Sequence, residues 1–95
     1  LVHNAAILET EPFETLTLER WQRTVNVGIQ AAFLLTQGVW KGMRNAGGGC
    51  VVFVSSRSGI EGFKDESAYC TAKHGLEGFM KCLALEGEEH GIFAH

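Results

Sequence analysis

The sequence predicts an α/β protein that forms part of a doubly wound parallel sheet. Two long stretches with apolar residues at helical spacing alternate with short apolar runs, so the order is strand, helix, strand, helix. The run 50–54 is apolar on both faces, which is typical of a central parallel strand covered by helices on each side. No repeat or low-complexity tract interrupts this order, and residues 1–95 are interpreted as one partial catalytic segment of such a domain.

Composition narrows the class of protein. With 45% apolar and 20% charged residues, the chain resembles a globular protein that folds in water. The net charge of −3 and the absence of a basic run argue against nucleic acid or an anionic membrane as a partner, and no apolar stretch reaches the length of a membrane span. Cys50, Cys70 and Cys82 are odd in number and lack metal-type spacing, which favours reduced thiols in the cytoplasm and no metal centre.

The first half of the chain predicts a strand end followed by a long helix. Leu1 and Val2 indicate the tail of a buried strand, and Thr17 is a suitable N-cap residue. Helical spacing of apolar residues continues from Leu18 to about Arg44, as one helix or two abutting ones. The segment 45–49 should end it, because Asn and Gly tolerate the left-handed conformation found at helix C-termini.

Within this helix, the run 24–28 is a poor helix former. A local violation of this kind is expected where a functional group or a backbone carbonyl freed from the helix is needed. Asn26 lies at its centre and is therefore a candidate functional residue. An ordinary helix defect is the alternative interpretation.

The second half predicts a strand at 50–54, a loop at 55–65 and a helix from about Glu66 to Glu89, which Gly91 should end. The last residues resemble the start of another strand. Since apolar strand-like runs stand at both ends, we expect flanking strands of the sheet to lie outside residues 1–95.

Ser56, Tyr69 and Lys73 are the candidate catalytic residues. Ser56 follows the central strand, and ligands of open parallel sheets bind outside the carboxyl ends of the strands. Tyr69 and Lys73 share one helical face at spacing i, i+4, where an ammonium favours a neighbouring phenolate. Such a pair, taken alone, is more often packing plus a solvated amine. With Ser56 holding a substrate oxygen, the three could exchange a proton with a carbonyl or alcohol.

The segments 55–59 and 68–73 resemble the active site of classical short-chain dehydrogenases/reductases, with the thirteen-position step from Ser56 to Tyr69. The segments 1–6 and 25–27 resemble that family's Asn-Asn-Ala-Gly and helix-asparagine segments. The resemblance covers the whole chain in order and implies a Rossmann-like fold with this family's central catalytic segment.

The resemblance also implies functions for individual residues. Tyr69 would be the acid/base, Ser56 the substrate-oxygen anchor, Lys73 a ligand of the nicotinamide ribose, and Asn26 part of a proton relay. Asn4, Ala5 and Ala6 would lie beside NAD or NADP. His3 and Ala6 depart from the family pattern, which usually has Asn and Gly there, so altered local contacts are expected.

The resemblance further implies a small carbonyl or alcohol substrate and a homo-oligomer formed through the two long helices. No glycine-rich phosphate-binding turn stands at the required place, because 47–49 follows a helix and precedes a strand. One alternative is a truncated, inactive segment that acts only by helix-mediated association. A serine hydrolase using Ser56 or Ser58 is a weaker alternative, since the Gly-x-Ser-x-Gly pattern is absent.

Overall fold

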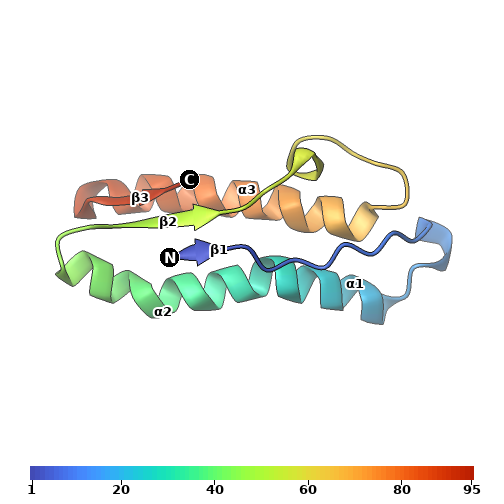
Figure 1. Cartoon of the computed structure of the whole chain (residues 1–95), viewed down its shortest axis with the longest axis horizontal. Helices are drawn as coiled ribbons and strands as arrows, with labels where there is room; N and C mark the ends of the chain where they lie inside the picture. Colours follow the sequence, from blue (N-terminus) through green and yellow to red (C-terminus); the bar gives the residue numbers. More distant parts are fainter.

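The computed structural model describes residues 1–95, with three strands and two long helical segments (Figure 1). The main elements are β1 (Val2–His3), α1 (Leu18–Val25), the π-helical turn η2 (Asn26–Gln30), α2 (Ala31–Asn45), β2 (Gly49–Phe53), α3 (Ser67–Gly87) and β3 (Ile92–Ala94). Three short 3-10 turns complete the chain: η1 (Phe13–Thr15), η3 (Arg57–Gly59) and η4 (Glu88–His90).

The strands form one parallel sheet in the order β1-β2-β3. Val2 pairs with Val52, and Gly49 pairs with Ile92. The predicted order of strand, helix, strand, helix and the parallel sheet are therefore confirmed, and the strand-like run at the end of the chain is β3.

Both helical segments pack against the same face of the sheet. Ala32 of α2 and Leu76 of α3 meet Val51 and Phe53 of β2 in one buried cluster. On the opposite face the strand side chains are open, with Val2 67% and Phe93 62% exposed. The sheet is thus apolar on both faces, as predicted, but α1–α2 and α3 cover only one of them.

The helix boundaries follow the predicted caps closely. The Thr17 hydroxyl accepts the Arg20 N–H at 3.2 Å, and Gly91 adopts the left-handed conformation at φ 69°. Both ends of two predicted elements differ by one or two residues, since β2 spans Gly49–Phe53 and α3 spans Ser67–Gly87 before a single 3-10 turn. None of the helices combines the length and the apolar character needed to cross a membrane.

The interruption predicted at 24–28 is confirmed as the π-helical turn η2. There the Ala31 N–H donates to the Asn26 carbonyl, five residues back, which widens the helix by one residue. Gly28 of this turn is buried, and a Cβ added to it would lie 3.0 Å from Ala72 Cβ. The wide turn therefore rests directly on α3.

Candidate active site

Lys73 occupies the carboxyl end of the covered sheet face. Its side chain is only 4% exposed, and Nζ donates to the Val54 carbonyl at 2.8 Å, immediately after β2. The same ammonium lies 5.7 Å from the centroid of the Tyr69 ring. Burial lowers the pKa of Lys73, because desolvation disfavours its charged form. The structure thus brings Tyr69 and Lys73 together at the end of β2.

Ser56 lies two residues beyond Val54 and is exposed. Its Oγ accepts the Ser58 N–H at 3.0 Å, and its carbonyl accepts the Gly59 N–H at 2.9 Å. A hydroxyl oxygen has two lone pairs and one proton, so the Ser56 proton and its second lone pair remain available to a ligand.

Ser58 and Glu66 are site residues that sequence reasoning missed. Ser58 was interpreted there only as a loop former, or as a hydrolase nucleophile. In the structure its buried hydroxyl donates to Glu66 Oε1 at 2.8 Å. Neither Ser56 nor Ser58 bonds a histidine, which the hydrolase alternative requires. One signal in the sequence could have indicated Glu66: it is an acidic residue at the predicted start of a helix, three positions before Tyr69, where the helix dipole favours a negative charge.

Asn26 is further from this group. Its side chain is exposed and makes no hydrogen bond to Ser56, Tyr69 or Lys73, and its carbonyl is engaged by Ala31. The connection runs through packing, because Gly28 two residues later contacts Ala72, the neighbour of Lys73. The structure therefore links the π-helical turn, rather than the Asn26 side chain, to the lysine.

His3 is a third residue that sequence reasoning did not assign to the site. Its ring is 2% exposed, lies edge-on to Phe53 with centroids 6.2 Å apart, and leaves Nε2 without a hydrogen-bond partner. Burial lowers its pKa, the Gly28 backbone opposes this shift, and the positive charge of Lys73 adds to it. Burial and the charge of Lys73 thus both favour the neutral form of His3.

The carboxyl ends of β1 and β2 meet at one rim. The Val54 N–H donates to the His3 carbonyl at 3.0 Å, so the exposed segment 4–6 and the segment 54–56 leave the sheet side by side. This rim is where open parallel sheets bind ligands. Lys73 bonds Val54 at this rim, Tyr69 lies next to Lys73, and Ser56 follows two residues after Val54. A phenol, an ammonium and a hydroxyl are groups that can polarise an oxygen and exchange a proton. The chain contains no cluster of three His, Cys, Asp or Glu side chains suited to a metal ion.

Known proteins resemble this chain along its entire length. The chain is 38% identical over 92 residues to an acetoacetyl-CoA reductase of Shinella zoogloeoides and 35% identical to a D-threitol dehydrogenase of Mycolicibacterium smegmatis. Each alignment covers 97% of this chain but only 38% and 35% of those proteins. The chain therefore spans little more than a third of their length.

Solved structures agree with this similarity. An acetoin dehydrogenase from Enterobacter cloacae superposes with a TM-score of 0.94 at 33% identity, over 98% of this chain and 37% of that one. A 4-hydroxyisoleucine dehydrogenase complexed with NADH superposes with a TM-score of 0.94 at 29% identity, over 98% and 41%. Because the family model of short chain dehydrogenases also matches residues 1–95, the chain belongs to the short-chain dehydrogenase family.

Proposed function

We propose that the protein is an NAD(P)-dependent oxidoreductase that interconverts a carbonyl and a secondary alcohol, with Tyr69 as the acid/base. The observation that carries the proposal is the buried Lys73 ammonium, which lies 5.7 Å from the Tyr69 ring and bonds the Val54 carbonyl at the rim. Residues 1–95 would be the catalytic segment, and Ser56 would anchor the substrate oxygen.

The residues at the rim fit a nicotinamide nucleotide. Lys73 has three N–H donors and spends one on Val54, so two remain for ribose hydroxyls. The exposed segment of Asn4, Ala5 and Ala6 beside it has short side chains that leave room for a planar ring. The bound nucleotide would supply or accept the hydride.

The protein's own groups would handle the proton. In reduction, the Tyr69 hydroxyl gives its proton to the carbonyl oxygen while the Ser56 hydroxyl donates a hydrogen bond to the same oxygen. The Lys73 ammonium favours the resulting phenolate. Asn26 would take part in returning a proton from solvent towards Lys73, through the π-helical turn that packs on α3. The alcohol is oxidised by the reverse sequence.

The relatives suggest probes for the cofactor and the substrate. They include reductases and dehydrogenases of acetoacetyl-CoA, D-threitol and acetoin, and the solved neighbours include an NADH complex and a protein assigned as an NAD(P)-dependent gluconate 5-dehydrogenase with NADP bound. We infer a small carbonyl or alcohol substrate and either NAD or NADP. All three cysteines are free, which fits a reducing compartment such as the cytoplasm.

The test uses the full-length protein, the probes acetoacetyl-CoA, acetoin and D-threitol, and NAD(H) or NADP(H). Turnover of at least one probe is expected in the wild type. Tyr69→Phe should abolish it while nucleotide fluorescence still reports binding. Retained turnover in Tyr69→Phe would contradict the acid/base assignment. Absence of both turnover and nucleotide binding in the wild type would contradict the oxidoreductase proposal as a whole.

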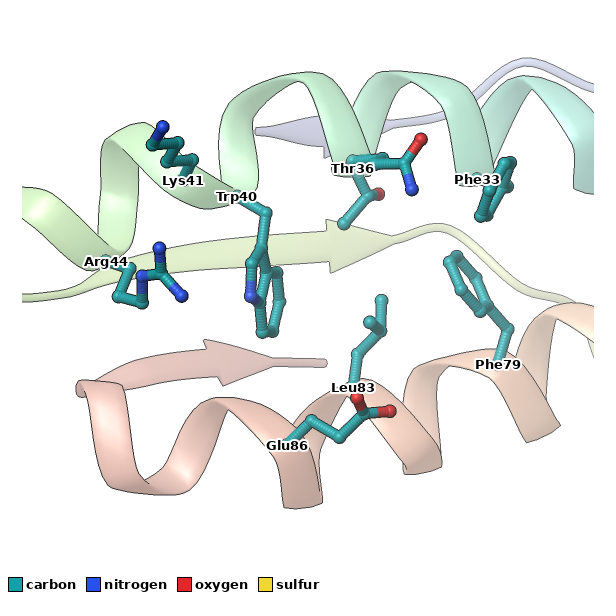
Figure 2. A pocket seen from close by; sticks show the side chains of 9 residues that line it. Phe33, Thr36, Trp40, Lys41, Arg44, Phe79, Leu83 and Glu86 are labelled. Carbon is teal, nitrogen blue, oxygen red and sulfur yellow. The ribbon is translucent and has the colours of Figure 1, made fainter.

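The groove between α2 and α3 favours a second candidate function, association. Figure 2 shows Phe33 and Trp40 of α2 facing Phe79 and Leu83 of α3 around a groove of about 430 Å³. The large apolar side chains left 45–73% exposed on these helices include Phe33, Leu34, Leu35 and Leu85. Exposed apolar patches of this kind mark association surfaces. We infer a homo-oligomer through these helices, either of the active enzyme or of a segment whose only activity is association.

The oligomer proposal is tested by sedimentation. The wild type should form a dimer or larger species, and Phe33→Glu, at an exposed residue that lines the groove, should shift it towards monomer. Glu19→Gln on α1, also exposed, serves as the control. A wild type that stays monomeric at micromolar concentration would contradict the association proposal, whereas nucleotide binding would still decide the enzymatic one.

A further inference from the structure

We propose that Ser58 and Glu66 are positioning residues that hold the Ser56 hydroxyl in its working orientation. The proposal rests on the proposed function, in which Ser56 anchors the substrate oxygen. The hydrogen bonds Ser56–Ser58–Glu66 form a bridge from the loop after β2 to the start of α3, the helix that carries Tyr69.

The bridge consists of two consecutive hydrogen bonds through one residue. The Ser58 backbone N–H donates to Ser56 Oγ at 3.0 Å, and the Ser58 side-chain hydroxyl donates to Glu66 Oε1 at 2.8 Å. Ser58 is only 6% exposed, so water does not compete freely for either bond. Cys70 adds a weaker contact, with Sγ 3.9 Å from the same carboxylate oxygen.

This arrangement determines how Ser56 can act. With one Oγ lone pair occupied by the Ser58 N–H, the Ser56 proton points elsewhere and can serve a ligand oxygen. Without the bond, the hydroxyl of this exposed residue can rotate among its staggered positions and bond to water. The bond therefore selects the donor orientation that the proposed function requires.

Glu66 connects this orientation to Tyr69. It lies three residues before Tyr69, about one helical turn, and the 3-10 turn η3 that contains Ser58 packs closely on α3. Gly59 shows how close this packing is, because an added Cβ would lie 3.4 Å from the Lys73 carbonyl. A carboxylate at the start of a helix is itself favoured by the helix dipole. The bridge thus sets Ser56 and Tyr69 relative to each other.

The experiment compares variants of the full-length protein. Ser58→Ala and Glu66→Ala remove the side-chain bond, and Glu66→Gln keeps an oxygen acceptor without the charge. Glu88→Ala, on the exposed turn η4, is the matched control. Two measurements are made: amide hydrogen exchange of residues 57–60, and steady-state kinetics with acetoin and NADH or the best probe of the panel above.

In Ser58→Ala and Glu66→Ala, the Ser58 amide is expected to exchange roughly 10-fold faster, and kcat to fall roughly 10-fold with KM for the nucleotide unchanged. Glu66→Gln, which keeps an acceptor for the Ser58 hydroxyl, should show a smaller change than Glu66→Ala in both measurements, and Glu88→Ala should match the wild type. In a Ser56→Ala background, Ser58→Ala should lower kcat no further, because its effect acts through the Ser56 hydroxyl.

Unchanged exchange in Glu66→Ala would overturn the bridge. An equal loss of kcat from Ser58→Ala with and without Ser56 would show a general structural effect and would also overturn it. If the wild type neither turns over a probe nor binds a nucleotide, the proposed function fails, and the exchange experiment then decides the bridge separately.

Discussion

The contact between Gly28 of η2 and Ala72 of α3 can be tested directly, because Ala72 is the neighbour of Lys73. Gly28 is helical and buried, and a methyl group placed there would lie 3.0 Å from Ala72 Cβ. This separation is well below the ordinary carbon–carbon contact of about 3.5–4.0 Å, so Gly28→Ala must push η2 away from α3. Ala72 precedes Lys73, so the displacement reaches the lysine.

The magnitude follows from two opposing effects. Alanine in place of glycine in a helix stabilises by about 1 kcal/mol. Overpacking of a buried contact costs about 1–3 kcal/mol. Gly38 of α2 provides the matched control, because an added Cβ there meets nothing within 4 Å. Gly38→Ala should therefore gain about 1 kcal/mol, and Gly28→Ala should be about 1–3 kcal/mol less stable than that control.

The free energy of unfolding of the full-length protein, from urea denaturation, measures both variants. A third variant moves the methyl group of residue 72 to residue 28. Gly28→Ala combined with Ala72→Gly restores the space, so the two changes should couple favourably by about 1–3 kcal/mol in a double-mutant cycle. Turnover should fall in Gly28→Ala and recover in the double variant.

The reasoning would be refuted if Gly28→Ala stabilised the protein as much as Gly38→Ala. Additive single and double variants would lead to the same conclusion, since they would show that η2 and α3 do not touch at this point.

Three further predictions concern the core and the charges. Leu76→Ala, at a side chain 2% exposed, should cost about 2–5 kcal/mol of unfolding free energy, whereas Ile60→Ala, 73% exposed, should change it by less than about 0.5 kcal/mol. Because the pKa of His3 is lowered in the folded state, the unfolded chain binds a proton at higher pH than the folded protein does. The free energy of unfolding should therefore fall as the pH drops below about 6.5. His3→Asn should reduce that loss, as measured by urea titrations from about pH 7 to about pH 5. Lys73→Met should lower kcat roughly 100-fold or more without lowering the melting temperature. Lys81→Met, at an exposed lysine of the same helix, should leave both unchanged. A large drop in the melting temperature of Lys73→Met would show instead that the ammonium is needed for stability.

Local signals in the sequence were sufficient for most of the fold. Thr17, with its side-chain oxygen, and Gly91, with no Cβ, each determine a helix end by chemistry within one turn, and both ends were predicted. The poor helix formers around Asn26 predicted where the long helix is interrupted. That both helical segments cover the same sheet face could not be predicted, because it depends on how distant residues such as Ala32 and Leu76 meet on β2.

The residues of the candidate site also fall into two groups, those that local spacing predicts and those that only contacts between distant segments bring together. Tyr69 and Lys73 are neighbours through one turn of one helix, so their spacing alone predicts that they meet. His3 packs against Phe53 only because β1 pairs with β2, and Ser58 reaches Glu66 only because the loop 55–65 folds back on the start of α3. Such contacts between distant residues carry no periodic signal, which explains why these two residues were missed.

The Lys73 ammonium also has no carboxylate partner, which is unusual for a buried charge. The acidic residue near the start of its helix, Glu66, accepts a hydrogen bond from Ser58 instead. A single backbone carbonyl is the hydrogen-bond partner of this ammonium, and burial lowers the pKa of Lys73 because desolvation disfavours its charged form. In the proposed function, the absence of a salt bridge leaves the ammonium free to stabilise the Tyr69 phenolate, and it leaves two N–H donors for a ligand.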